Sequence, residues 1–465
     1  MKVRKRAIDP GTREKPLYFN TCRYLRGVAR HACCYSRNML SAAPPRVDAP
    51  SIDRTKTGLV LTGGGARAAY QVGVLKAISA ILVEQGWPAS ANPYDIICGT
   101  SAGAINATAL ACHADAFGEG LQKVVKIWEN FRAEQVYRAD SLGVLRSGAR
   151  WLSLLSFGWL LRTWRANPPN ALLDNAPLNT LLNRMLNFPR LDAALIDGNL
   201  HALAITASSY SAGHHITFYQ SEAAIEPWVR TQRLSVRGQI GVEHLLASSA
   251  IPLIFPATPI FCNGRREYFG DGSMRQLAPI SPAIHLGAEK VLVIGNGKIT
   301  EPTSERGQDA QYPSLAQVAG HAMSSIFLDS LAVDIERMTR INLTLSYLTE
   351  EQRALTPLRP VELLFISPSQ RLDEIASRHV ASLPAPIRMI LGGIGATEVR
   401  GAALASYLLF ESSYTQELMA LGARDVAVRK AEVVAFFGKY MERRAPGRAA
   451  GVEPDITKKA TAPAI

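Results

Sequence analysis

Short apolar runs alternate with longer stretches of helical periodicity through the middle of this chain. Buried strands are predicted by the apolar runs at residues 57–62, 94–98, 201–207, 216–219 and 290–295. Helices are predicted by apolar spacing over residues 68–85, 102–112, 121–131 and 242–249. Strands that alternate with helices predict an α/β fold of three layers, α/β/α, with a mainly parallel central sheet.

The pattern changes after a polar stretch at residues 300–312. Residues 315–345 and 397–441 have helical spacing, and the apolar run 361–366 between them predicts one more strand. We therefore expect a domain over residues 55–300 and a mainly helical C-terminal region over residues 301–442. Residues 443–465 are polar and rich in Pro, Gly and Ala, which is typical of a disordered tail.

Residues 141–166 combine large apolar side chains with arginines. Three of the six tryptophans lie here, together with Arg146, Arg150, Arg162 and Arg165. An amphipathic segment of this kind fits a helix at a membrane interface or a cap over an apolar pocket. An ordinary core helix has the same spacing, so both interpretations stay open.

Composition indicates a globular chain with one charged end. The 465 residues are 47% hydrophobic and 19% charged, which argues against a disordered or multi-span protein. Residues 1–50 carry +8 of the total net charge of +12. We expect residues 1–54 to form a basic, disordered arm, either attracted to an anionic membrane surface or simply solvated, unless the true start of the chain lies further on.

The cysteine pattern and the lack of a signal-peptide pattern suggest a cytoplasmic protein. Any contact with the inner face of the membrane is expected to be peripheral. The six cysteines show no metal-ligand spacing, and no metal or cofactor is predicted. No apolar run follows the basic start as in a signal peptide, and no run of 18 apolar residues suits a transmembrane segment.

The first candidate for chemistry is Gly99-Thr100-Ser101-Ala102-Gly103, between a predicted strand and a predicted helix. It fits G-x-S-x-G, in which a sharp turn exposes the serine hydroxyl and the flanking glycines, Gly99 and Gly103, leave room for the turn. A tight βα turn without catalysis fits the same five residues. A nucleophilic serine also needs a base, an oxyanion site and a place for the acyl group.

A second glycine-rich turn, residues 63–67, follows the first predicted strand. The backbone N–H groups of such a turn can face a developing oxyanion. Arg67 can steady this loop or contact a substrate phosphate. The stretch from Gly63 to Ala68 also fits the dinucleotide pattern G-x-G-x-x-A, but the acidic partner, Glu84, falls inside a helix rather than at a strand end.

The general base is the hardest of these catalytic groups to identify from the sequence. None of the nine histidines lies in a distinctive pattern, so no Ser-His-Asp triad can be assembled. The best acidic candidate is Asp271, between Gly270 and Gly272 at a strand-to-loop junction. A plain Asp-Gly turn is the alternative.

Taken together, the motifs resemble the patatin-like phospholipase family. Four occur in order over residues 55–300: Gly63-Gly64-Gly65-Ala66-Arg67, Gly99–Gly103, Ala247–Pro256 and Tyr268–Gly272. The resemblance implies a Ser-Asp dyad without histidine, with Ser101 as nucleophile and Asp271 as base. It also implies an oxyanion hole at residues 63–67, written out as Gly63, Gly64, Gly65, Ala66 and Arg67. Two departures from the family pattern are Ala68, where glycine is usual, and Ser273 after Gly272.

The resulting hypothesis is a lipid acyl hydrolase, a phospholipase or esterase that cleaves acyl esters through an acyl-enzyme. The expected partners are a lipid or phospholipid substrate and, transiently, a membrane surface, with no nucleic acid. An acyltransferase or thioesterase with the same dyad is one alternative. A catalytically silent lipid-binding scaffold is the other.

Overall fold

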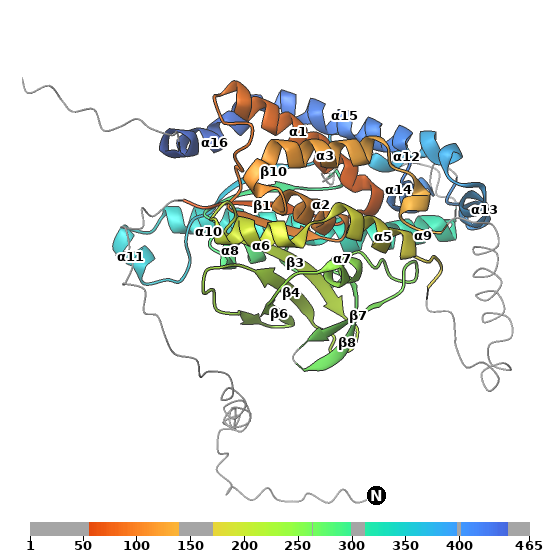
Figure 1. Cartoon of the computed structure of the whole chain (residues 1–465), viewed down its shortest axis with the longest axis horizontal. Coiled ribbons are helices and arrows are strands. Elements are labelled where there is room, and N and C mark those ends of the chain that lie inside the picture. The colour runs from red at the N-terminus through yellow and green to blue at the C-terminus, as the bar shows by residue number, and fades with distance from the viewer. Residues whose placement is uncertain (1–54, 139–170, 263, 299–311, 398–400, 445–465) are drawn as a thin grey trace, which may run out of the picture. The chain divides into compact units, whose positions relative to one another are not determined.

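A ten-stranded mixed sheet forms the centre of the structure (Figure 1). The computed structural model describes residues 55–138, 171–262, 264–298, 312–397 and 401–444. The main strand order is β10-β9-β1-β2-β3-β4-β6-β5, and the hairpin of β7 and β8 joins through β3. In that order the strands are Glu362–Ile366, Lys290–Ile294, Thr57–Leu61, Ile96–Thr100, Ala202–Ser209, His215–Gln220, Arg233–Arg237 and Val229–Arg230, with β7 at Thr258–Cys262 and β8 at Arg265–Asp271.

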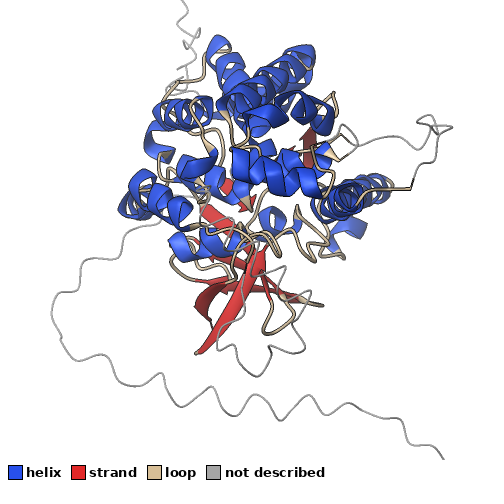
Figure 2. Ribbon diagram, turned by 90° about the vertical axis from the view of Figure 1, so that its right-hand side faces the viewer, coloured by secondary structure: helices blue, strands red, loops and turns tan. Residues whose placement is uncertain are grey.

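The sheet has a parallel half and a largely antiparallel half. All pairs from β10 to β3 are parallel, whereas β3 pairs antiparallel with both β4 and β8. Every residue of β1, β2 and β9 is buried, as expected for parallel strands covered on both faces. Figure 2 shows helices crowding around the parallel half, while strands of the other half extend beyond them.

Side chains alternate between two cores along each parallel strand. Leu59 and Leu61 belong to the larger core and Val60 to the smaller one, because successive side chains of a strand point to opposite faces. The larger core includes residues from α1 (Ala69–Glu84), α2 (Ala102–Ala111), α3 (Phe117–Glu129), α5 (Ala176–Met185), α6 (Phe188–Ile196), α12 (Leu372–His379), α13 (Ala385–Gly393), α14 (Ala402–Leu408), α15 (Ser412–Val428) and α16 (Lys430–Arg444). The smaller core includes residues from α8 (Ser281–His285) and α10 (Ser330–Ser346). The predicted α/β class with helical layers is confirmed.

The C-terminal helices belong to the same compact unit as the sheet, Thr55–Ile465. The helices α15 and α1 lie side by side in Figure 1. They touch closely at two glycines: a Cβ on Gly422 would lie 2.5 Å from the Tyr70 carbonyl oxygen, and one on Gly73 would lie 2.0 Å from that of Met419. Strand β10 also comes from this region and forms one end of the sheet. Whether residues 55–300 form a separate domain stays a prediction.

Several predicted elements differ in detail from the structure. The helix predicted over residues 315–345 is α9 (Leu315–Ser324), a π-helical turn η4 (Ser325–Asp329) and α10. The stretch 397–441 contains α14, α15 and α16. The short helices α12 and α13 were not predicted, because stretches of eight and nine residues show little periodicity. The arm at 1–54, the segment 141–166 and most of the tail lie outside the described residues.

Two helical stretches are long and apolar enough to cross a membrane by length and composition. They are Gly65–Glu84 and Leu315–Ser346. In the first, 72% of the most apolar window is buried inside the structure, which is typical of a core helix, and in the second 22% is buried. Both helices were predicted from the sequence, but neither as a candidate span, because charged and polar residues interrupt both apolar runs.

Candidate active site

Ser101 occupies a strained turn between β2 and α2. It has φ 56° and ψ −131°, a backbone conformation that non-glycine residues rarely adopt. Gly103 permits this turn, because a Cβ there would lie 2.3 Å from the Leu61 carbonyl oxygen of β1. The backbone N–H of Ser101 donates to Ser248 Oγ at 2.8 Å. The turn therefore fixes the serine side chain at the end of the parallel sheet, beside the N-terminus of α2.

Asp271 meets Ser101 from the antiparallel half of the sheet. It is the last residue of β8, and Ser101 Oγ donates to its Oδ2 at 2.6 Å. The Ser273 N–H donates to Oδ1 at 2.8 Å, and the Asp271 N–H donates to the Ala250 carbonyl at 2.9 Å. Among the described residues, no histidine is hydrogen-bonded to Ser101 or Asp271. The two candidates from sequence, 170 residues apart, are thus in direct contact.

The Asp271 carboxyl is fully buried, and this decides its acidity. Burial raises its pKa from the ordinary 3.8 to about 6, against the hydrogen bonds from Ser101 and Ser273. No salt bridge joins it to a cation in the described part of the chain. At neutral pH it is therefore mostly a carboxylate, but a more basic one than a solvent-exposed aspartate.

The glycine loop 63–67 follows β1 and includes most of the 3₁₀ turn η1 (Gly65–Ala68). Gly65 has φ +54°, and a Cβ on it would lie 2.3 Å from the Tyr407 carbonyl oxygen. Asn296 Nδ2 donates to the carbonyls of Thr62 at 2.8 Å and Gly63 at 3.1 Å. Within the described residues, the N–H groups of Gly64 and Gly65 have no recorded acceptor. They remain available to a ligand.

Arg67 is engaged with the C-terminal region rather than with open space. Its side chain is 4% exposed, and its Nε donates to Ser406 Oγ at 2.7 Å. Its guanidinium carbon lies 4.0 Å from the centroid of the Tyr407 ring, a cation–π contact. Its own N–H already donates to the Gly64 carbonyl at 3.1 Å. Of the two roles considered from sequence, steadying the loop agrees with these contacts, and binding a substrate phosphate does not.

Three positioning residues carried no role in the sequence interpretation. Ser248 accepts the Ser101 N–H and donates to the Thr206 carbonyl at 2.6 Å, so it links the serine turn to β3. Gln276 Nε2 donates to Thr100 Oγ1 at 3.0 Å, next to the nucleophile candidate. Asn296 orients the glycine loop, as described above. Ser248 lies within the quoted motif at 247–256, which was a signal for it, whereas no local pattern marks Gln276 or Asn296.

An apolar pocket begins at Ser101 and runs along α2. Its enclosed volume is about 40 Å³, so its wall side chains lie close together. Its walls are almost entirely apolar side chains from α2, α3 and α5 and from the loops beside them. The lining includes Gly65, Ser101, Ile105, Ala109, Val124, Ile127, Trp128, Leu178, Leu181, Met185, Phe255 and Phe410. Such a pocket suits a hydrocarbon chain whose polar end lies at Ser101.

The geometry weakens the competing interpretation of the glycine loop. Glu84 ends α1 and accepts a hydrogen bond from Lys430 Nζ at 2.6 Å, so it does not lie at the end of the neighbouring strand β2, where a ribose contact would need it. In the described ranges, no group of three or more His, Cys, Asp or Glu side chains is arranged to hold a metal ion.

A comparison with protein families agrees with the motifs. The model of the family described as patatin-like phospholipase matches residues 59–284. VipD from Legionella pneumophila is 14% identical, with a TM-score of 0.28, and the match covers 79% of this chain and 67% of that one. Human GIVD cytosolic phospholipase A2 is 12% identical, with a TM-score of 0.40, and the match covers 84% of this chain and 60% of the human one.

Both solved structures are thus distant in sequence, and no curated protein matches this chain. The family match is independent of them, and it includes Ser101, Asp271 and the glycine loop. The chain therefore carries, over residues 59–284, a domain of the patatin-like phospholipase family.

Proposed function

We propose that this protein is a lipid acyl hydrolase in which Ser101 is the nucleophile and Asp271 the base. The observation that carries the proposal is the 2.6 Å hydrogen bond from Ser101 Oγ to Asp271 Oδ2 at the end of an apolar pocket. A carboxylate with a pKa near 6 can accept the serine proton and still be ionised at pH 7. The family match supports the same reaction class.

The reaction proceeds in two halves. Ser101 Oγ attacks the ester carbonyl carbon while its proton moves to Asp271, and the N–H groups of Gly64 and Gly65 stabilise the oxyanion. The tetrahedral species collapses as Asp271 returns the proton to the leaving alkoxide, which leaves an acyl-enzyme. Asp271 then takes a proton from water as the water attacks the acyl carbon, and collapse releases the fatty acid and restores Ser101 Oγ–H.

Covalent labelling and paired variants test this mechanism. Ser101→Ala and Asp271→Asn should each abolish hydrolysis of a p-nitrophenyl acyl ester, and Ser101→Ala should also abolish labelling by a fluorophosphonate. Ser235→Ala and Asp334→Asn, at other buried positions, are matched controls that should retain activity. Activity that survives in the Ser101 variant would contradict the mechanism.

The same experiments separate the alternatives. If the intact protein gives no fluorophosphonate adduct and no hydrolysis, the scaffold hypothesis replaces the enzyme. If it gives an adduct, product analysis with and without an alcohol acceptor distinguishes a hydrolase from an acyltransferase. A matched series of oxygen esters and thioesters tests the thioesterase alternative.

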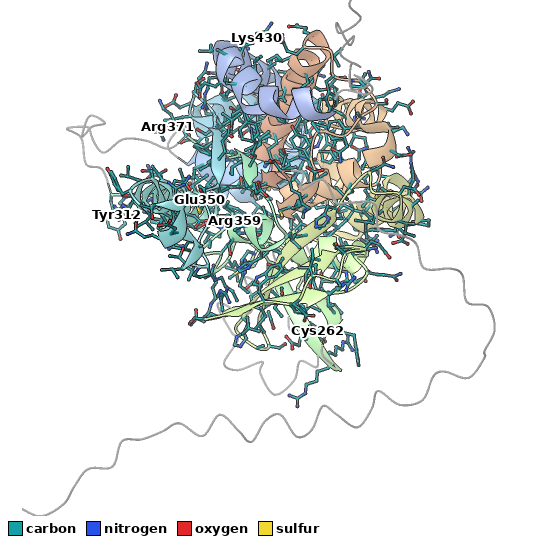
Figure 3. The ribbon with its side chains drawn as sticks, turned by 90° about the vertical axis from the view of Figure 1, so that its left-hand side faces the viewer. Cys262, Tyr312, Glu350, Arg359, Arg371 and Lys430 are labelled. Atoms are coloured by element: carbon teal, nitrogen blue, oxygen red, sulfur yellow. The ribbon has the colours of Figure 1, made fainter. Side chains whose placement is uncertain are left out.

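We also propose that the protein acts at a membrane surface. Besides the basic arm, the hairpin of β7 and β8 supports contact: Phe261 is 77% exposed and Tyr268 45% exposed, and Arg266 lies over the Tyr268 ring. Phe261 and Arg266 pair across the two strands, and β8 leads directly to Asp271. Figure 3 labels Cys262 on this hairpin, which extends away from the helices. Aromatic and basic residues together favour an interface with anionic lipid.

Vesicle sedimentation tests this contact. Binding to phosphatidylserine vesicles should fall when residues 1–50 are removed and fall further with Phe261→Ser and Tyr268→Ser. Tyr312→Ser, at a 97% exposed site labelled in Figure 3, is the control for an exposed aromatic elsewhere. Unchanged binding in all variants would contradict the proposed surface.

A further inference from the structure

A second cavity adjoins the far end of the apolar pocket. It is an open cleft between α3 and the α5–α6 segment, and its floor is the C-terminal end of α2. Ala109, Val124, Ile127, Leu181 and Met185 line both cavities, so these side chains form a shared wall. Ala109 lies eight residues after Ser101, about 12 Å along the helix at 1.5 Å per residue. The cleft therefore lies at the rear of the space that begins at Ser101, on the other side of this shared wall.

The rim of this cleft is basic. Lys123, Lys126 and Arg190 line it together with His113, and no acidic side chain is among its lining residues. Arg190 is paired with Asp115 at 2.8 Å. Neither Lys123 nor Lys126 forms an ion pair with an acid in the described ranges, and both are exposed. The two lysines thus offer unneutralised positive charge beside an apolar interior.

His113 orients one of these lysines. Its Nδ1 lies 3.0 Å from the Ala109 carbonyl, to which Nδ1–H donates, and Lys123 Nζ lies 3.1 Å from Nε2. Burial lowers the pKa of His113, so the ring is neutral at pH 7 and accepts a hydrogen bond from the ammonium. The lysine is held at the cleft with two further N–H donors directed elsewhere.

We propose that this rear cleft binds a long-chain fatty carboxylate, with its carboxylate at Lys123 and Lys126 and its tail in the apolar pocket. This proposal rests on the proposed function, because that ligand is the product class of the reaction. The bound tail occupies the space of a substrate acyl chain, so the product inhibits hydrolysis of long-chain esters. The flexible Met185 side chain, half-buried between the two cavities, lets the tail through.

The chemistry of the two cavities favours this ligand class over others. An inorganic phosphate or a nucleotide would leave the adjoining apolar wall of Val124, Ile127 and Leu181 unused. A neutral amphiphile would leave the lysine charges without a partner. A single chain with one terminal anion matches both features.

Calorimetric titration of the Ser101→Ala protein with oleate, and separately with oleyl alcohol, tests the proposal without turnover. Changing Lys123 and Lys126 to alanine should weaken oleate binding about fivefold for each lysine, as for surface ion pairs, and leave oleyl alcohol unaffected. The matched control changes Lys76 and Lys430, which line other surfaces and are paired with Glu129 and Glu84, to alanine. An unchanged ratio of oleate to oleyl alcohol affinity in the Lys123/Lys126 variant would overturn the proposal.

A second variant tests the path of the tail. Met185→Trp fills the shared wall and should weaken oleate binding at least tenfold, and oleate should then no longer compete with a fluorescent long-chain alcohol. Oleate binding that survives Met185→Trp while still depending on the lysines would show that the tail lies elsewhere, against the proposal. Failure of the proposed function would give a different result. The intact protein would then show neither hydrolysis nor fluorophosphonate labelling, whereas the oleate titration would be unchanged.

Discussion

The segment that matches the family and the helices that follow it contribute different parts of one site. Residues 59–284 contain the proposed reacting groups, Ser101 and Asp271, and the glycine loop. The later helices provide support: Ser406 and Tyr407 of α14 hold Arg67 and pack against Gly65, and Phe410 lines the apolar pocket. A segment that carries the sequence motifs can therefore contain the candidate reacting side chains but lack some of the residues that hold them in position.

The two regions also use a buried aspartate in different ways. Asp271 has hydrogen-bond donors but no cation beside it, and burial raises its pKa to about 6. Asp334 of α10 is 4% exposed, and burial raises its pKa too, but it accepts the Ile280 N–H at 3.0 Å and pairs with Arg337 at 3.2 Å. A carboxylate without a counter-charge is suited to accept a proton, whereas a paired one ties two elements together.

The largest expected effect is the loss of the fold when the second region is removed. A fragment of residues 55–300 loses α15, which covers α1, and β10, which covers β9. We expect it to aggregate or lack a cooperative unfolding transition, because the exposed face of α1 is apolar. Circular dichroism and size-exclusion chromatography measure this. A folded, active fragment would establish residues 55–300 as an independent domain and contradict this dependence.

Breaking the link between the regions should slow the reaction. Arg67→Met removes the hydrogen bonds to Ser406 Oγ and to the Ala403 carbonyl. We expect kcat to fall roughly 10- to 100-fold with little change in KM, because the loop donors lose their alignment. Arg67→Lys should recover part of the rate. Arg340→Met, at an exposed arginine of α10, is the control. A rise in KM with an unchanged kcat would indicate instead that Arg67 binds substrate.

The pH dependence of the reaction should report Asp271. Since the carboxylate form accepts the proton, kcat/KM should be level above pH 6 and fall about tenfold for each pH unit below it. Asp334→Asn should leave this profile unchanged, because that carboxyl lies on α10 and bonds to Ile280. A profile that stays level down to pH 4 would exclude a base with the raised pKa.

Stability should depend on pH in the opposite sense to activity. The folded pKa of Asp271 lies above its unfolded value, so its stabilising contribution is fully present below about pH 4 and is lost as pH rises through 6. A rise from 3.8 to about 6 corresponds to about 3 kcal/mol, and Asp271→Asn should stabilise the protein by up to that amount at pH 8 and by little at pH 4.

Thermal unfolding of the wild type, Asp271→Asn and Asp334→Asn at both pH values measures the difference. The Asp334 variant should show a smaller dependence on pH, because Arg337 offsets the cost of burying its charge. An equal dependence of stability on pH in the two variants would contradict the different roles of Asp271 and Asp334.

The smallest expected effect concerns the packing of α15 on α1. Gly422→Ala places a Cβ about 2.5 Å from the Tyr70 carbonyl oxygen, and we expect a loss of about 1–3 kcal/mol in the free energy of unfolding. Gly438→Ala on α16, where a Cβ would meet no atom within 4 Å, is the matched control and should be neutral or slightly stabilising. Chemical denaturation measures both. Equal effects would show that the helix contact adapts without cost.

The local features of this protein could be predicted from its amino-acid sequence. Apolar runs located β1, β2 and β9 because strands buried on both faces contain almost no polar side chains. The Ser101 turn, the glycine loop and the Asp271 junction were visible because each depends on a few adjacent residues with special backbone requirements. The family resemblance joined them in order, and with it came the expectation that a carboxylate, not a histidine, would face the serine.

Contacts between distant segments of the chain, in contrast, become visible in the folded structure alone. The contact of Arg67 with α14, the role of Ser248 and the rear cleft at Lys123 join residues from different elements, and helical periodicity does not specify which helix packs on which. The raised pKa of Asp271 is likewise a property of its burial, not of its neighbours in the chain. Short sequence motifs identify the candidate reacting groups. Their burial and their pKa values depend on packing between residues that lie up to hundreds of positions apart in the chain.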